Sequence, residues 1–203
     1  MNGAPALDVS RETFERLEIY AGLLRKWNPK INLVAKSTLE DLWTRHIVDS
    51  AQIFGLVQHP IDHWVDLGSG AGFPGLVVAI MAMESGSPAD VTLIESDARK
   101  CAFLRTVLRE TGATAKVLTK RIEAAPSQNA NILSARALAD LSTLLEYAER
   151  HLVPSGTALF HKGATWKKEL PDAQEKWKFD HRVVTSTTEE GPVVLSIAGV
   201  ARV

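Results

Sequence analysis

The sequence predicts an α/β fold in which a doubly wound, Rossmann-like sheet of seven strands carries a helical appendage at its N-terminus. From about residue 61 onward, short apolar runs alternate with amphipathic segments. Strands joined through helices form a mostly parallel sheet with right-handed crossovers. Only STTEEGP (186–192) separates the last two apolar runs, so we expect an antiparallel hairpin to close one edge. We therefore divide the chain into a helical appendage, 1–60, and a sheet domain, 61–203.

The appendage has the apolar periodicity of two helices. Ser10 is a candidate N-cap for the first helix, which we expect to end at Asn28 because the following Pro29 disfavours α conformation in the residue before it. Ser37 and Glu40 form a capping-box pattern, which predicts a second helix that continues as far as Pro60.

The sheet domain contains seven strand candidates and three helix candidates. The strands are expected at 63–67, 91–95, 115–119, 131–135, 157–161, 181–185 and 193–203. The helices are expected at 74–84, 97–111 and 139–152. Asp97 is the predicted N-cap of the middle helix, and Gly112 is predicted to end it.

Composition indicates a globular protein without export or membrane segments. The 203 residues are 45% hydrophobic, no apolar run approaches the roughly 20 residues that span a bilayer, and the N-terminus lacks a basic start followed by an apolar block. We therefore expect a cytoplasmic protein with no membrane association. The single cysteine, Cys101, excludes an internal disulfide and a cysteine-rich zinc site. We expect it to be buried in a helix, and we expect no metal site.

Positive charge is concentrated in two stretches, although the net charge of the whole chain is −1. Residues 97–121 contain seven Lys or Arg against two acids, and residues 25–46 contain five against two. Either stretch alone is explained by a solvated helix face. The chain as a whole lacks the basic excess of a nonspecific nucleic-acid binder.

The segment VDLGSGAGFPG (65–75) is a glycine-rich turn between a strand and a helix. Its glycines have the spacing G-x-G-x-G, and Phe73 stands where a dinucleotide fingerprint requires its third glycine. No Gly-Lys-Ser/Thr follows, so a P-loop is excluded as well. A tight glycine turn without the diphosphate feature suits a ligand that has an adenosine and no phosphate, such as S-adenosylmethionine.

Two acids bracket this turn. Asp66 precedes Gly68 by two residues, and we expect it near the strand tip, where it binds the ammonium of the amino-acid end directly or through water. Glu95 ends the second strand 27 residues after Gly68, in the position of an acid that accepts hydrogen bonds from ribose hydroxyls. The pattern predicts a class I methyltransferase sheet. Alternatively, Asp66 caps the loop and Glu95 ends a strand for solubility.

Seven segments in this order resemble one family. They are NLVAKS (32–37), RHIVDS (45–50), DLGSGAGFPG (66–75), LIESDARKCAFLRTV (93–107), KRIEAAP (120–126), ILSARALADL (132–141) and FHKG (160–163). Over residues 28–163 the chain resembles the bacterial 16S ribosomal RNA guanine-N7 methyltransferases, ribosomal small subunit methyltransferase G, also called glucose-inhibited division protein B. The resemblance implies S-adenosylmethionine as cofactor and, as partner, 16S ribosomal RNA within the small subunit or an assembly intermediate. We expect a monomer.

The resemblance also implies which residues bind the cofactor. In addition to Asp66, these are Gly68, Gly70, Phe73, Glu95, Ile122, Glu123 and Arg136. Ile122 would border the adenine with its backbone, and Glu123 would meet the exocyclic amine or a neighbouring amide. Arg136 would point into the crevice from the end of the fourth strand.

The chain lacks the motifs of two other classes of methyltransferase, which limits the reactions that it can catalyse. The chain lacks the Asn/Asp-Pro-Pro-aromatic motif of amino-group methyltransferases, and Cys101 is not placed as a nucleophile for pyrimidine C5. Guanine N7 has an in-plane lone pair, so methylation there requires alignment and exclusion of water rather than a general base. We assign Arg136 and Lys162 to holding phosphate or the guanine O6.

Polar residues of the appendage are expected to cover the pocket from the other side. They are Asn32, Arg45, His46, Asp49 and Ser50. Arg45 is predicted to be a catalytic residue together with Arg136 and Lys162. The simpler alternative is an ordinary i,i+4 ion pair between Arg45 and Asp49. His46 is expected to be a packed core histidine. Scattered lysines, Lys162, Lys167, Lys168, Lys176 and Lys178, are candidates for the mouth of the crevice.

Two other functions remain compatible with the sequence. One is a class I methyltransferase that acts on a small molecule or a protein. The other is a binding module for S-adenosylmethionine or RNA without catalysis.

Overall fold

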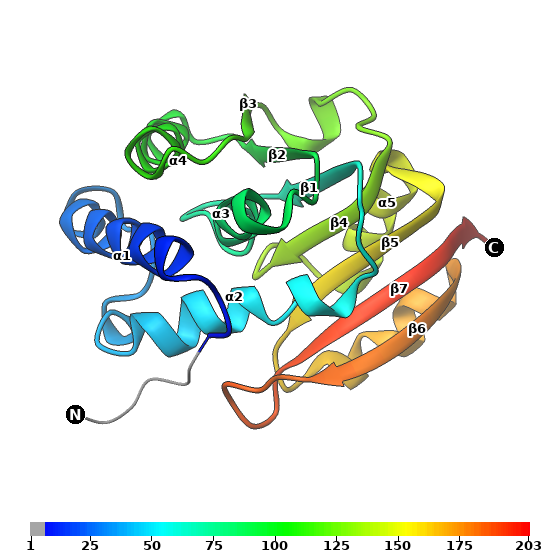
Figure 1. Ribbon diagram of the computed structural model, residues 1–203. Helices are drawn as coiled ribbons and strands as arrows, with labels where there is room; N and C mark the ends of the chain where they lie inside the picture. Colours follow the sequence, from blue (N-terminus) through cyan, green and yellow to red (C-terminus); the bar gives the residue numbers. More distant parts are fainter. Residues whose placement is uncertain (1–6) are drawn as a thin grey trace.

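The computed structural model describes residues 7–203, which form one seven-stranded sheet with helices on both faces (Figure 1). The strand order is β3-β2-β1-β4-β5-β7-β6. The strands are β1 (His63–Leu67), β2 (Asp90–Glu95), β3 (Lys116–Thr119), β4 (Ala130–Arg136), β5 (Leu152–Lys162), β6 (Trp177–Thr185) and β7 (Val193–Arg202). Strands β1 to β5 are parallel, and β7 runs antiparallel to both β5 and β6. The predicted doubly wound sheet and closing hairpin are confirmed.

The order of the strands reverses between β1 and β4, and in such sheets ligands bind beyond the carboxyl ends of the strands at this point. Helices α1 (Arg11–Ile31), α3 (Gly75–Ser85) and α4 (Ala98–Thr111) cover one face of the sheet (Figure 1). Helix α5 (Leu141–His151) and the short α6 (Leu170–Gln174) cover the other. Side chains along β1 alternate between the two faces of the sheet. Trp64 packs in the first apolar cluster, on one face, and Val65 packs in the second apolar cluster, on the other.

Helix α4 follows its predicted signals. Asp97 is the N-cap, and its side chain accepts hydrogen bonds from the amides of Arg99 and Lys100. Gly112 follows the last helical residue with φ of +70°. Cys101 is fully buried in this helix, as expected.

Helix α1 is longer than predicted. Ser10 caps it as expected, but the helix continues through Pro29 and ends at Ile31. Proline in the last turn removes only one intrahelical donor. The side chain of Asn28 compensates by accepting hydrogen bonds from the amides of Leu33 and Val34, 2.8 Å each, which fixes the chain as it leaves the helix.

The second appendage helix is broken into short pieces. In place of one helix to Pro60, the chain forms 3-10 turns at Lys36–Thr38 and Phe54–Leu56, a π-helical segment at Trp43–Val48 and the short α2 (Asp49–Ala51). The predicted capping box at Ser37 does not form. In the π-helical segment the amide of Asp49 donates to the Thr44 carbonyl, five residues earlier. The Arg45 carbonyl, which an α-helix would use for this bond, is therefore free for another donor.

Two further differences lie near the C-terminus. Strand β6 begins at Trp177, earlier than the predicted 181–185, and a 3-10 turn (Trp166–Lys168) followed by α6 connects β5 to β6. A helix of five residues is too short to produce a recognisable periodicity.

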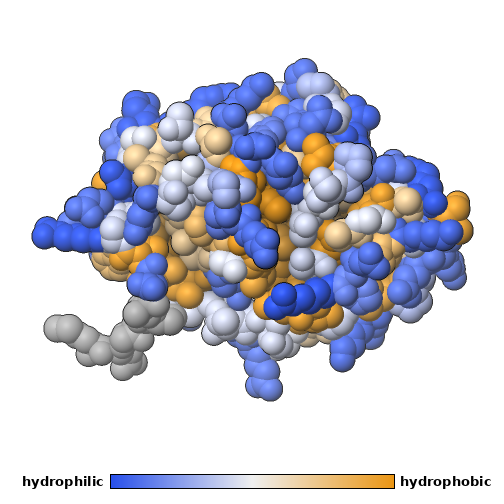
Figure 2. Space-filling view, turned by 45° about the vertical axis from the view of Figure 1, so that its right-hand side comes forward, coloured by the Kyte–Doolittle hydropathy of each residue, from blue (hydrophilic) through white to orange (hydrophobic). Residues whose placement is uncertain are grey.

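One face of the protein carries both hydrophilic and hydrophobic side chains (Figure 2). Figure 2 shows hydrophilic side chains over most of one face, with hydrophobic surface divided into small areas between them. None of the helices within residues 7–203 combines the length and apolar character needed to cross a membrane.

Candidate functional site

The glycine-rich turn lies at the carboxyl end of β1, beside the point where the strand order reverses. Gly68, Gly70 and Gly72 have φ of +59°, +55° and +100°. A Cβ at Gly72 would overlap Leu76 and come within 2.9 Å of the Tyr20 hydroxyl, so only glycine fits. Near a Cβ at Gly70, by contrast, only the Gly68 carbonyl would lie within 4 Å, at 3.6 Å. The backbone of Gly70 is therefore open to the close approach of a ligand.

Glu95 ends β2 with its carboxylate held against this turn. Its Oε2 accepts a hydrogen bond from the Gly70 amide, and its Oε1 accepts one from the Asp97 amide, each 2.8 Å long. A carboxylate oxygen has two lone pairs, so each oxygen keeps one acceptor position. Two acceptors side by side suit the two hydroxyls of a ribose. The carboxylate also disfavours binding of a phosphate at the glycine-rich turn, because its negative charge occupies the amide that a phosphate would use.

Asp66 lies beneath the turn rather than at the strand tip. Its side chain has no exposed surface, and its Oδ1 accepts a 2.7 Å hydrogen bond from the Ser134 hydroxyl. Its Oδ2 has no hydrogen-bond partner among residues 7–203, and the expected contact with the ammonium of a ligand, directly or through water, stays a prediction. Asp66 shares its face of β1 with Trp64 because side chains alternate along a strand, and Trp64 also bonds to Ser134. Burial raises the pKa of Asp66 from its ordinary value near 3.8 to about 6.

Arg136, at the end of β4, connects the sheet to the appendage. Its Nη1 donates to Asp49 Oδ2 over 3.1 Å and to the Arg45 carbonyl over 3.2 Å, and this carbonyl is the one that the π-helical segment leaves free. Its Nη2 donates to His46 Nδ1 over 2.6 Å, and its guanidinium lies 5.0 Å from the centre of the Phe73 ring. The Arg136 and Asp49 side chains are only 17% and 15% exposed.

His46 has a positioning role in this arrangement. Its ring stacks on Phe73 at 5.0 Å, its Nδ1 accepts from Arg136, and its Nε2 bonds to the Thr38 hydroxyl at 2.8 Å. Burial and the neighbouring Arg136 lower the pKa of His46 to about 4, so the ring is neutral at pH 7. Because its Nδ1 lone pair is already engaged, His46 is not a free general base.

Phe73 also differs from its expected role. Its ring is 5% exposed and packs between His46 and Tyr20, whose ring centre lies 5.1 Å away. The Tyr20 hydroxyl donates a 2.6 Å hydrogen bond to the Ala71 carbonyl. The side chain of Phe73 therefore fastens the glycine-rich turn to the appendage, and only the backbone of this residue is left to face a ligand.

A polar pocket of about 300 Å³ opens next to Arg136. We use this name for the cavity lined by Thr38, Arg45, His46, Asp49, Arg136, Ala137, His161, Lys162, Gly163, Ser186, Thr188, Glu189, Pro192 and Val193. The appendage, the ends of β4 and β5, and the β6–β7 turn all contribute to it. His161 and the β6–β7 turn were not predicted to line a site. No motif in the sequence marks the residues of this turn.

Arg45 is the exposed cation of the polar pocket. Its guanidinium pairs with Glu189 of the β6–β7 turn at 3.1 Å, with side chains 45% and 50% exposed. The alternative of an i,i+4 ion pair between Arg45 and Asp49 is therefore wrong, since Asp49 pairs with Arg136. The pocket thus presents a guanidinium donor and a carboxylate acceptor side by side.

Lys162 has a different environment from the one expected. Its ammonium donates to Glu169 Oε2 over 2.6 Å and to the Ala139 carbonyl over 3.1 Å, and the side chain is 8% exposed. It joins β5 to the segment before α6. Because Lys162 also lines the polar pocket, its contact with phosphate or base stays a prediction. The sequence did not predict the pairing of Lys162 with Glu169, because Glu169 lies beside a helix that periodicity does not reveal.

The other predicted residues divide between core and surface. Ile122 is buried in the second apolar cluster, which leaves its backbone as the part able to border a ligand. Glu123 is exposed and accepts a 2.7 Å hydrogen bond from the Tyr147 hydroxyl, which lowers the pKa of its carboxyl. Ser50 is buried, and Asn32 ends α1 in a left-handed conformation. Lys167, Lys168, Lys176 and Lys178 are exposed.

Comparison with known proteins identifies the family. Residues 13–193 match the family described as rRNA small subunit methyltransferase G. The protein of that name from Ruegeria pomeroyi is 58% identical over 200 residues, 98% of each chain, and the one from a Ruegeria species (strain TM1040) is 55% identical over 197 residues, 97% of this chain and 96% of the relative. A solved structure of a SAM-dependent methyltransferase from Aquifex aeolicus has the same fold, with a TM-score of 0.59 at 14% identity over 87% of this chain and 97% of that one. The chain therefore belongs to the rRNA small subunit methyltransferase G family.

Proposed function

We propose that this protein transfers the methyl group of S-adenosylmethionine to N7 of a guanine in 16S ribosomal RNA. The observation that carries the proposal is Glu95, whose carboxylate is fixed on the glycine-rich turn with one free acceptor position on each oxygen. Glu95 ends β2 on one side of β1, and Arg136 ends β4 on the other side and lines the polar pocket. Family membership supplies the ribosomal substrate.

The residues present fit a phosphate-free adenosine. Glu95 would accept hydrogen bonds from the ribose hydroxyls, the open backbone at Gly70 would lie against the cofactor, and Ile122 and Glu123 would border the adenine. Gly68 has the Leu138 side chain within 2.5 Å of the position of a Cβ, so glycine is required there for packing. Arg136 closes the crevice on the side of the polar pocket. The bound cofactor supplies an electrophilic methyl group on a sulfonium.

The polar pocket matches the edges of guanine. Arg45 offers donors to O6, and Glu189 offers a carboxylate to the two neighbouring donors of guanine, N1–H and the 2-amino group. Thr38, Ser186 and Thr188 add hydroxyls. No other standard base presents one acceptor followed by two donors along this edge, so the pair favours guanine.

The reaction requires alignment rather than proton transfer. Guanine N7 would accept the methyl group that the bound cofactor would supply, and its in-plane lone pair makes a general base unnecessary. No proton leaves N7, which agrees with a neutral His46 whose lone pair is engaged. The ion pair of Arg136 and Asp49 is neutral overall, so it adds little charge that would oppose the transfer.

We assign the small ribosomal subunit or an assembly intermediate as the physiological substrate, with a monomeric, cytoplasmic enzyme. A chain with net charge −1 binds bare RNA weakly. Folded RNA presented with ribosomal proteins would supply the remaining contacts.

Transfer of a labelled methyl group tests the proposal. Purified small subunits and S-adenosylmethionine labelled in its methyl group should yield 7-methylguanosine after nucleoside digestion of the RNA. Label in a protein or in adenine would overturn the assignment. Binding of S-adenosylmethionine without turnover on subunits, on 16S RNA and on assembly intermediates would identify a binding module instead.

A further inference from the structure

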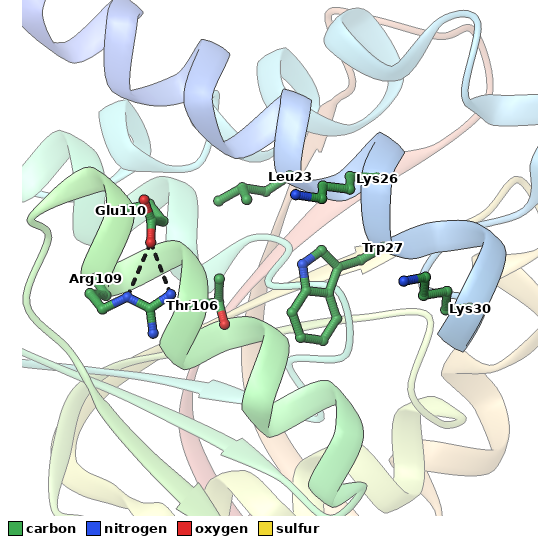
Figure 3. Close-up of a pocket in the computed structure, with 7 residues that line it drawn as sticks. All are labelled: Leu23, Lys26, Trp27, Lys30, Thr106, Arg109 and Glu110. Carbon is green, nitrogen blue, oxygen red and sulfur yellow. Dashed lines mark hydrogen bonds and ion pairs between the residues drawn. The ribbon is translucent and has the colours of Figure 1, made fainter.

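A second cavity, of about 450 Å³, lies between α1 and α4, on residues that take no part in the polar pocket. We call it the α1–α4 groove. Lys26, Trp27 and Lys30 line it from α1, and Arg109 and Glu110 line it from α4 (Figure 3).

The fold brings the two basic stretches of the sequence together at this groove. Between Ile19 and the end of α1 at Ile31 there is no acid, and the cations of this half-helix are exposed. Helix α4 adds four cations along its length, of which Arg109 is 70% exposed. Each stretch alone resembles an ordinary solvated helix face, but their packing side by side concentrates positive charge on a protein whose overall net charge is −1 (Figure 1).

Acidic side chains neutralise little of this charge. Glu110 pairs with its neighbour Arg109 at 2.9 Å, an exposed contact that water screens. Asp97 is the N-cap of α4 and pairs with Arg99 at 3.3 Å, at the end of the helix away from the groove. Lys26 and Lys30 make no ion pair with any residue of 7–203 within 4.0 Å, so their ammonium groups are available to a phosphate.

An aromatic surface lies between these cations. The Trp27 ring packs on Phe103 with centres 5.7 Å apart, and it faces the groove between Lys26 and Lys30 (Figure 3). Cations flanking an aromatic face suit a nucleic-acid strand, which offers phosphates at regular intervals and flat bases or riboses between them.

The groove and the candidate active site are connected through α1 and α4. Helix α4 begins immediately after Asp97, whose amide donates to Glu95, and it lines the groove near its other end, at Arg109 and Glu110. Helix α1 ends in the loop held by Asn28, and that loop leads to Thr38 in the wall of the polar pocket.

We propose that the α1–α4 groove binds the phosphate backbone of the RNA substrate beside the methylated nucleotide. The inference rests on the proposed function for the identity of the RNA. The α1–α4 groove would then contribute to the affinity for RNA without contacting the reacting atoms. Changes in the groove should therefore alter RNA binding and leave cofactor binding and the rate at saturation intact.

A charge reversal tests the groove. We would compare wild-type protein with the double variant Lys26→Glu/Lys30→Glu and with Arg109→Glu. A matched control is Lys116→Glu, an exposed lysine at the start of β3, at the opposite end of the sheet from the crevice. Fluorescence anisotropy with an end-labelled 16S RNA transcript, over a series of KCl concentrations, gives the affinity and its salt slope.

The double variant should bind the transcript about 10-fold more weakly, with a salt slope reduced by about 1.5, because about two phosphate contacts are lost. KM for RNA should rise while kcat and the Kd for S-adenosylmethionine stay unchanged. Unchanged affinity, or an equal loss in Lys116→Glu, would overturn the proposal. A loss confined to methylation of assembled subunits, with normal RNA affinity, would assign the groove to a ribosomal protein and overturn it as well.

The outcome is separable from that of the proposed function. If the wild-type protein binds the transcript through the groove but forms no 7-methylguanosine, the proposed reaction fails and the groove stands. If 7-methylguanosine forms equally well at low RNA concentration in all variants, the groove fails and the reaction stands.

Discussion

Arg136 and Asp49, 87 residues apart in the chain, form a largely buried ion pair with 3.1 Å between Nη1 and Oδ2. The pair joins the end of β4 to the appendage at the edge of the polar pocket. Asp49 Oδ1 also accepts hydrogen bonds from Ser186 and Thr188, so the same carboxylate holds the β6–β7 turn. One acid thereby fixes three segments around the candidate active site.

Removing this acid should destabilise the protein. Asp49→Asn leaves the Arg136 charge without its partner in a site of low exposure, and we expect a loss of about 3 kcal/mol in the free energy of unfolding. Urea denaturation monitored by tryptophan fluorescence measures it. Glu189→Gln, which breaks the half-exposed pair with Arg45, is the matched control and should cost less than about 1 kcal/mol. Equal losses in the two variants would contradict the difference in burial.

Cofactor affinity should depend on Glu95 and Gly70. Glu95→Ala removes two charge-assisted acceptors, so the Kd for S-adenosylmethionine should rise at least about 10-fold, which corresponds to about 1.4 kcal/mol. Gly70→Val should weaken binding as well, since a β-branched residue is strained at φ of +55°. Isothermal titration calorimetry on variants with unchanged circular dichroism is the measurement. Glu146→Ala, an exposed acid on α5, serves as the control. Normal affinity in both site variants would place the cofactor elsewhere.

The sequence predicted features that depend on local signals. Asp97 and Gly112 bound α4 through their own side chain and backbone, and the G-x-G-x-G spacing located the turn. Prediction failed where distant residues decide the outcome. Pro29 did not end α1, because Asn28 satisfies the backbone beyond the helix. The ion pair of Lys162 with Glu169 was not predicted, because Glu169 lies in a segment without periodicity.

The direction of buried side chains was equally hard to predict. Asp66 was placed on the correct strand, but the face that it occupies depends on which side of the sheet receives α3. The pairing of Arg136 with Asp49 depends on a π-helical segment, which neither periodicity nor capping patterns indicate. Recognition of the family therefore identified residues of the site more reliably than it identified their contacts.

Two buried groups should give opposite pH dependences of stability. The folded state raises the pKa of Asp66 to about 6, so it holds a proton that the unfolded chain releases near pH 4, and stability falls as pH rises between these values, by at most about 3 kcal/mol. The folded state lowers the pKa of His46 to about 4, so the unfolded chain binds a proton below pH 6.5 and stability rises with pH over nearly the same window.

Single variants should separate these two slopes. In His46→Gln the free energy of unfolding should decrease from pH 4 to pH 6 more steeply than in the wild type, because the opposing contribution of His46 is removed. In Asp66→Asn it should instead increase with pH. Urea denaturation at intervals of pH measures both, and parallel curves for the two variants would contradict the assignment of the buried protons.

Base recognition should depend on Glu189. Glu189→Gln loses the carboxylate that accepts from N1–H and the 2-amino group of guanine, and kcat/KM for RNA should fall about 10-fold. An RNA with inosine at the target position lacks the 2-amino group. The wild-type enzyme should discriminate against it, and the variant should discriminate less. Equal discrimination by the two enzymes would remove Glu189 from base recognition.

Arg45 should act on the same step. Arg45→Ala should reduce methyl transfer at least about 10-fold while the Kd for S-adenosylmethionine changes less than twofold, since Arg45 lines the polar pocket and Glu95 lies in the crevice. Parallel measurements of methyl transfer and calorimetry on one preparation compare the two effects. Equal losses would place Arg45 at the cofactor instead.

The π-helical segment makes the length of the appendage critical. An α-helix turns by about 100° per residue, so deleting one residue between Trp43 and Val48 would restore the α-helical register and rotate Asp49 away from the sheet by that angle. In a regular α-helix the Arg45 carbonyl would accept an intrahelical hydrogen bond, and Arg136 would lose two acceptors at once. The number of residues in this segment is therefore fixed by the arginine that it must meet.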